Sequence, residues 1–218
     1  MIRLKTFYFS VLFMCFLSTV GIAQEIGGVI KLKSSTIFFD NFGFNDFNFT
    51  GEIHSNLSGS KYTVQLKSNN DTFEGLITDK FSKLHIDLTY KNTVVKGVID
   101  MSTNGTKDTW DVLIDEKRLS GVVKHNALGT ADTYELQFEN RKLSGEIFKN
   151  LNSLVYDLMF GESDISGVMK YNISTVKHTY DLKAENLSKE DFVVVLFVEI
   201  IKLINEHITE VEEFQEES

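Results

Sequence analysis

The 218-residue chain contains no proline, a single tryptophan and a single cysteine, Cys15. The absence of proline excludes proline-rich linkers, polyproline ligand segments and collagen-like repeats. Cys15 falls within the N-terminal segment that we assign below to a leader. We therefore expect a mature chain without disulfides, thiolate metal sites or cysteine nucleophiles.

Positive charge is also scarce, with 22 Lys and Arg against 31 Asp and Glu and a net charge of −9. This balance argues against binding to nucleic acid, because the electrostatic interaction with phosphates would be repulsive. The acidic excess gathers near the C-terminus, so we predict a solvated acidic tail at 209–218. No apolar run is long enough for a bilayer-spanning helix, and we expect no transmembrane span in the mature chain.

The N-terminal segment has the pattern of an export signal. Arg3 and Lys5 precede an apolar run over 7–17, and small residues follow as far as Ala23. A basic start, a short apolar core and a small-residue cleavage site together predict a cleavable signal peptide at 1–23. The protein is therefore expected to be secreted or periplasmic.

The rest of the chain is an internal repeat. A phrase of the form apolar–polar–Gly–x–apolar returns every 22 or 24 residues, with its glycine at Gly51, Gly75, Gly97, Gly121, Gly145 and Gly167. A degenerate copy precedes these at 27–30. A second phrase, aromatic–x–apolar, lies between successive glycines and begins at Tyr62, Trp110, Tyr134, Tyr156 and Tyr180, with Leu84 in the aromatic position of one copy. Both phrases alternate with a period of two, which is typical of half-buried strands, and polar turn residues separate them. Each repeat is thus predicted to be a β-hairpin.

The spacing between the two phrases indicates which face of the sheet is buried. From each glycine to the next aromatic position is always an odd number of residues, between 9 and 13. A change of two residues keeps the same side chains on the same face, whereas a change of one would turn the apolar face outward. Glycine weakens a strand, so its recurrence indicates sharp curvature or close approach of another element, or a groove for an extended ligand.

A hydrophobic helix is predicted at 187–208. Ser188 and Asp191 form an acceptable capping box, and a dense apolar segment follows. Glu199, Lys202 and Glu206 leave only one narrow polar stripe, so most of the helix circumference requires burial.

These elements predict a mainly β fold, an antiparallel up-and-down meander of about 12–14 strands over 24–186. The sheet is expected to curve or close into a barrel around the C-terminal helix, which belongs to the same domain. This layout is similar to that of tubby-like barrels, although the chain carries none of that family's motifs. The alternative is an open sheet with the helix at one end. A membrane barrel is disfavoured because the second face of the sheet carries charged residues.

The sequence contains no recognisable catalytic or metal-binding motif. None of its histidines has the spacing of a metal site, and His85 with Asp87 is interpreted as an exposed polar pair. We therefore expect no metal, no cofactor and no enzymatic activity. Apolar residues at outward positions of the strands form a candidate contact stripe, equally explained by β-propensity, at Leu76, Val98, Leu113, Val122, Met159 and Val168.

Two functional hypotheses remain from the sequence. The first is a secreted or periplasmic binding or structural module that contacts a protein partner through its sheet surface. The second is a carrier of a lipid or other apolar small molecule held between the curved sheet and the helix. They differ in whether side chains fill the space between sheet and helix.

Overall fold

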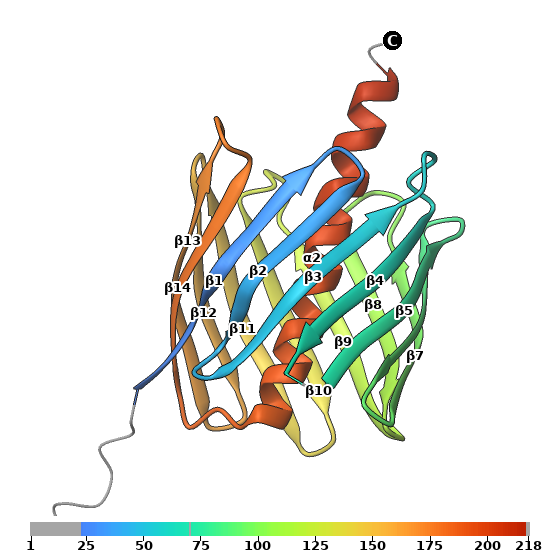
Figure 1. Ribbon diagram of the computed structural model, residues 1–218. Coiled ribbons are helices and arrows are strands. Elements are labelled where there is room, and N and C mark those ends of the chain that lie inside the picture. The colour runs from blue at the N-terminus through green and yellow to red at the C-terminus, as the bar shows by residue number, and fades with distance from the viewer. Residues whose placement is uncertain (1–22, 70, 217–218) are drawn as a thin grey trace, which may run out of the picture.

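The computed structural model describes residues 23–69 and 71–216, with the side chains of the C-terminal helix described as far as Glu206. Residues 1–22 of the predicted signal peptide lie outside this range. Fourteen antiparallel strands follow in chain order and close into a barrel around one helix (Figure 1). The strands are β1 (Ala23–Lys33), β2 (Thr36–Phe44), β3 (Phe47–Ser55), β4 (Lys61–Ser68), β5 (Asp71–Asp79), β6 (Lys83–Tyr90), β7 (Thr93–Met101), β8 (Lys107–Ile114), β9 (Lys117–His125), β10 (Ala131–Phe138), β11 (Arg141–Asn150), β12 (Ser153–Phe160), β13 (Ser163–Asn172) and β14 (Lys177–Glu185), and the helix is α2 (Lys189–Glu216).

Every strand pairs with its neighbours in sequence, and β1 pairs with β14 to complete the ring. The barrel predicted from the repeat is confirmed, and the open-sheet alternative is excluded. Closure satisfies the backbone groups that an open sheet would expose at its two edges.

The recurrent glycines and aromatic residues lie on the inner face, as their odd spacing predicts. Gly121 is the cross-strand neighbour of Trp110, and Gly145 is that of Tyr134. A side chain at Gly121 would place its Cβ only 2.1 Å from a backbone oxygen of β10, and the residue has a φ of 144°. Glycine is therefore required where neighbouring backbones approach closely and the strand bends.

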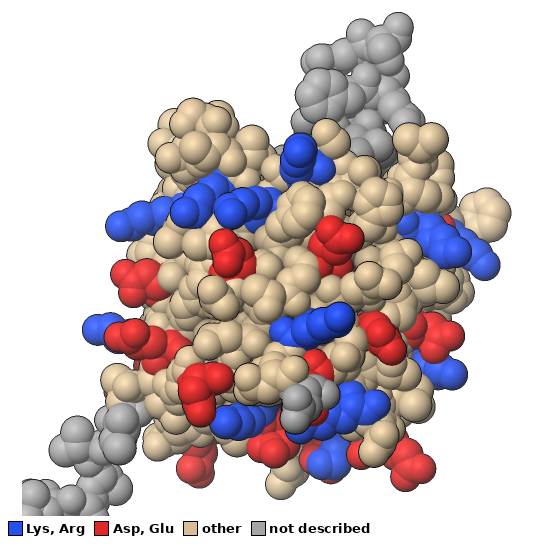
Figure 2. Space-filling view, in the orientation of Figure 1, with Lys and Arg blue, Asp and Glu red and all other residues tan. Residues whose placement is uncertain are grey.

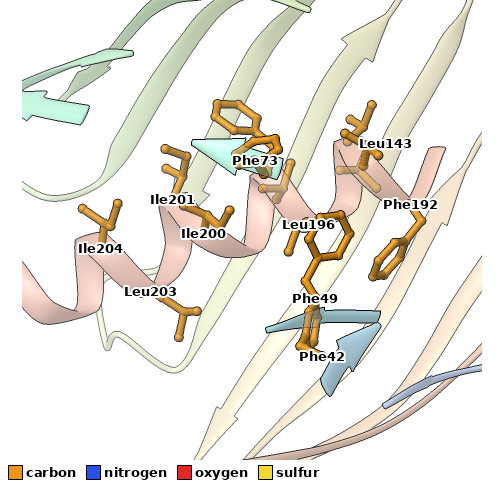
Figure 3. Close-up of a cluster of buried hydrophobic side chains, with 14 of the residues drawn as sticks. Phe42, Phe49, Phe73, Leu143, Phe192, Leu196, Ile200, Ile201, Leu203 and Ile204 are labelled. Atoms are coloured by element: carbon orange, nitrogen blue, oxygen red, sulfur yellow. The ribbon is translucent and has the colours of Figure 1, made fainter. Parts of the chain in front are cut away.

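The inner face packs directly on α2, which passes through the barrel (Figures 1 and 3). Phe192 near its start stacks on Phe44 with ring centroids 5.6 Å apart, and Phe197 meets Trp110 edge-on. Further along, Ile200 and Leu203 are completely buried. Over 192–197, side chains from the wall and from α2 pack against one another.

The two ends of α2 differ from the sequence prediction in detail. Ser188 Oγ accepts a hydrogen bond from the backbone N–H of Asp191, as a cap does, but the Asp191 carboxylate pairs with Arg141 instead of completing the box. The helix also continues to Glu216, through the acidic segment that we predicted as a tail. Glutamate is a good helix former, and the turns inside the barrel already supply the nucleus.

Candidate functional site: a polar cleft at the barrel mouth

A cleft of about 820 Å³ opens where α2 leaves the barrel. It lies between the helix and the strand ends of β7–β11, at the end of the barrel that we call the mouth. Its walls are mixed in character and include Asp108, Trp110, His125, Asp132, Tyr134, Lys149, Val198, Ile201, Lys202, Asn205 and Glu206. The volume falls within the range of small-molecule sites.

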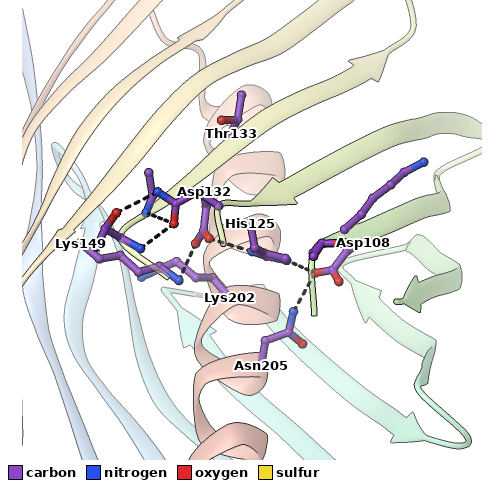
Figure 4. Close-up of polar contacts among 12 residues, drawn as sticks. Asp108, His125, Asp132, Thr133, Lys149, Lys202 and Asn205 are labelled. Atoms are coloured by element: carbon purple, nitrogen blue, oxygen red, sulfur yellow. Dashed lines mark hydrogen bonds and ion pairs between the residues drawn. The ribbon is translucent and has the colours of Figure 1, made fainter. Parts of the chain in front are cut away.

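The polar wall of the cleft is a continuous network (Figure 4). His125, the last residue of β9, contacts Asp132 of β10 through Nδ1 at 2.7 Å and Asp108 of β8 through Nε2 at 3.1 Å. Lys149 of β11 lies 2.9 Å from the second oxygen of Asp132. The helix joins the network through Asn205, whose amide nitrogen donates to Asp108 at 3.2 Å.

The two carboxylates keep His125 in its charged form. Hydrogen bonds to Asp108 and then Asp132 raise the pKa of His125 to about 9, against the opposing effect of burial. Burial alone would raise the pKa of Asp132, but its hydrogen bonds with His125 and Lys149 lower it. At neutral pH the imidazolium donates from both ring nitrogens, so His125 has no lone pair with which to act as a general base.

The inner part of the cleft is aromatic. Trp110 and Tyr134 are almost completely buried and line the cleft below the polar network. The indole N–H of Trp110 has no hydrogen-bond acceptor among the described residues. A buried donor without an acceptor is costly, so this N–H is an unsatisfied polar group in the wall of the cleft.

A buried ion pair lies further along α2. Glu199 and Lys202 are 5% and 6% exposed, and Lys202 Nζ lies 2.8 Å from Glu199 Oε1. The hydroxyls of Tyr156 and Tyr180 donate to the Glu199 carboxylate. Although burial acts to lower it, the pKa of Lys202 is raised by the carboxylates of Glu199 and Glu206. The polar stripe predicted on the helix thus faces the barrel wall, where tyrosines satisfy it.

The six predicted contact residues all lie on the outer wall, in which Leu76, Leu113 and Met159 are exposed and the three valines are half-buried. Strand register separates them from one another. Val98 lies between His85 and Asp111, and Leu113 lies between Lys96 and Arg118. Val122 and Val168 likewise each have an acidic neighbour, Glu135 and Asp181 respectively, while Leu76 pairs with Asp87 and Met159 with Asp164.

An unbroken apolar row on the outer wall runs instead through Phe148, Val155 and Val168, of which sequence reasoning selected only the last. His85 and Asp87 are exposed on the outer wall, and Asp87 pairs with Lys96 at 3.5 Å. Within the described ranges there is no group of three or more side chains suited to holding a metal ion.

Sequence reasoning missed the mouth cleft, although a signal for it exists. Asp108 and Asp132 stand two residues before inward aromatic residues, and His125 and Lys149 stand four residues after inward glycines. The two-residue period therefore places all four side chains on the inner face. Polar residues at inward positions near strand ends would have identified the network.

Comparison of the chain with known protein families, with curated proteins and with solved structures finds no match. In the part of the chain that the structure describes, α2 is not apolar enough over a sufficient length to cross a bilayer.

Proposed function

We propose that the protein is an exported, non-catalytic binding module that holds a small, uncharged polar ligand in the mouth cleft. The observation that carries this proposal is the Trp110 indole, which lines the cleft and whose buried N–H has no acceptor among the described residues. A hydroxyl or carbonyl oxygen of a ligand would satisfy this donor, and the aromatic rings of Trp110 and Tyr134 would cover the ligand's apolar surface.

The charges in the cleft favour an uncharged ligand. His125 and Lys149 are already paired with Asp108 and Asp132, so a charged ligand would have to compete with an existing ion pair. A molecule with several hydroxyl groups instead meets both donors and acceptors at short range without disturbing these pairs.

The same geometry favours binding over catalysis and over transport of an apolar molecule. His125 is held protonated by two carboxylates, which supports a structural role for the histidine. Packing of α2 against the wall fills the interior in which an apolar ligand would have to lie. The mouth cleft is also preferred to the sheet surface, because the outward apolar residues form only one short unbroken row and elsewhere have charged or polar neighbours.

Trp110 is the only tryptophan in the chain, so its fluorescence reports directly on the cleft. We expect a shift of Trp110 emission, and a rise in melting temperature, with at least one member of a panel of neutral mono- and disaccharides and polyols. Citrate and spermidine serve as charged comparisons and are expected to bind more weakly. A panel that changes neither the emission nor the melting temperature would contradict the proposal.

Two variants test whether a responding sugar occupies the cleft. Trp110→Phe keeps an aromatic ring but removes the N–H donor, and it is expected to weaken binding about tenfold by the thermal-shift assay. His85→Gln lies on the outer wall and is the matched control, for which unchanged binding is expected.

A further inference from the structure

The hairpin turns at the mouth carry fully exposed apolar side chains. Leu57, Phe81, Leu128 and Leu151 lie at the tips of four different turns and are 103%, 98%, 85% and 90% exposed. Ile173, in a fifth turn at the same end, is 63% exposed. We call these five residues the apolar crown. Turns are usually built from small or polar residues. A ring of large, exposed apolar side chains therefore indicates an interaction surface.

The opposite end of the barrel lacks such a ring. Among the described residues, its hairpin turns at 45–46, 91–92, 115–116, 139–140 and 161–162 contain only Asn, Asp, Glu, Lys and Gly. Phe81 makes the contrast sharper, because it has a φ of 54°, a left-handed conformation that is uncommon for a bulky residue. Phe81 therefore occupies a position where asparagine or glycine would fit the turn better.

The crown is accompanied by uncompensated positive charge. Lys33, Lys61, Lys80 and Lys107 are exposed at strand ends or turns around the mouth, and none makes an ion pair with another described residue. Figure 2 shows basic side chains towards this end and mixed charges over the rest of the same face. Other basic residues near the two ends are paired, as in Lys83 with Asp100 at the mouth and Lys91 with Asp71 at the opposite end.

The helix supplies matching chemistry at the same end. From Glu206, which lines the cleft, α2 continues to Glu216, a length of about 15 Å beyond the cleft. Within 206–217 the sequence is strongly acidic.

We propose that the mouth is the interface between two copies of this chain. In a mouth-to-mouth pair related by a two-fold axis, the acidic end of each α2 lies against the rim lysines and apolar crown of the other copy. Such an interface is self-complementary, as two-fold symmetry requires. A lipid surface is the other partner suited to an apolar, basic ring. It is disfavoured because the acidic end of α2 projects through the centre of the ring and would be repelled by anionic headgroups.

Sedimentation velocity of the protein beginning at Gln24, after the predicted signal peptide, tests this proposal. At tens of micromolar and low salt we expect a dimer, and 0.5 M NaCl is expected to raise its dissociation constant at least tenfold. Combined replacement Leu57→Ser, Phe81→Ser and Leu151→Ser is expected to give a monomer. These side chains are exposed, so the variant should keep the circular dichroism and melting temperature of the wild type. Leu113→Ser with Met159→Ser on the outer wall is the matched control and is expected to remain dimeric.

A charge-reversal experiment tests the pairing itself. Changing Lys61, Lys80 and Lys107 to Glu should give a monomer, and so should changing Glu210, Glu212 and Glu213 to Lys. Mixing the two reversed proteins should restore a dimer, because each rim then meets a helix of opposite charge. A wild-type monomer at 100 µM, or a dimer unaffected by the crown variant, would overturn the proposal. Binding of a monomer to phosphatidylserine vesicles through the crown would assign the surface to lipid and would equally overturn it.

Discussion

Raising the pH from 6 to 10 is expected to weaken the fold by removing the charge on His125. The folded-state pKa of about 9 lies above the ordinary value of 6.5. The stabilisation is therefore complete below pH 6.5 and is lost as the pH rises through 9. The difference corresponds to about 3 kcal/mol in the free energy of unfolding. Because the His125 side chain is only 24% exposed, solvent screens this interaction weakly.

Urea unfolding followed by Trp110 fluorescence at each pH measures this effect. The His125→Gln variant is expected to be less stable than the wild type at pH 6 and to approach it by pH 10. The difference between the two proteins separates His125 from the lysines and tyrosines that titrate in the same range. His85→Gln is the control and should follow the wild type at every pH. If the gap between wild type and His125→Gln stays constant from pH 6 to 10, the proposed charged network at the mouth is wrong.

Three other measurements test the barrel. Gly121→Ala is expected to lower the free energy of unfolding by about 3 kcal/mol or more, because its Cβ would collide with the backbone of β10. Gly129→Ala, in an open turn with a φ of 65°, should lower it by about 1 kcal/mol. Equal losses in urea unfolding would contradict this account. Glu199→Ala should cost about 3–5 kcal/mol because it leaves Lys202 charged and buried, while Glu199→Leu combined with Lys202→Met removes both charges and should cost less, with the unpaired Tyr156 and Tyr180 hydroxyls accounting for the remaining loss. Calorimetry that finds the double variant as unstable as the single one would refute this reasoning. Burial lowers the pKa of His178 to about 4, so stability should fall as the pH drops below 6.5 and through 4. His178→Phe is expected to move the acid midpoint of circular dichroism to lower pH, and an unchanged midpoint would exclude this role.

The strands of the barrel could be predicted because the residue pattern that specifies them is local and recurs in every repeat. A glycine at Gly121 and an aromatic residue at Tyr134 set both the strand period and the inward face, and every further copy adds the same constraint. The helix was predictable from its apolar density. Its extension to Glu216 was not, because an acidic segment suits a solvated tail as well as it suits an exposed helix.

The candidate site was harder to predict from the sequence, because it depends on which strands lie next to the helix. Asp108 and Asp132 are inward by period, and the register of β9 with its two neighbours β8 and β10 brings them to the two sides of His125. Similarly, the helix sequence shows Glu199 without showing that Tyr156 and Tyr180 would donate to it. The outward apolar residues were placed on the right face, but the register that separates Val98 from Val122 involves pairings between different hairpins.

The position of α2 after all fourteen strands has a consequence for folding. The segment that fills the centre follows the whole wall in chain order, and β14, which completes the ring, immediately precedes it. Without these two elements β1 has no partner on one side, and the apolar lining has nothing to enclose. A partly folded chain that lacks them therefore presents an open strand edge together with a concave apolar surface, a combination prone to aggregation.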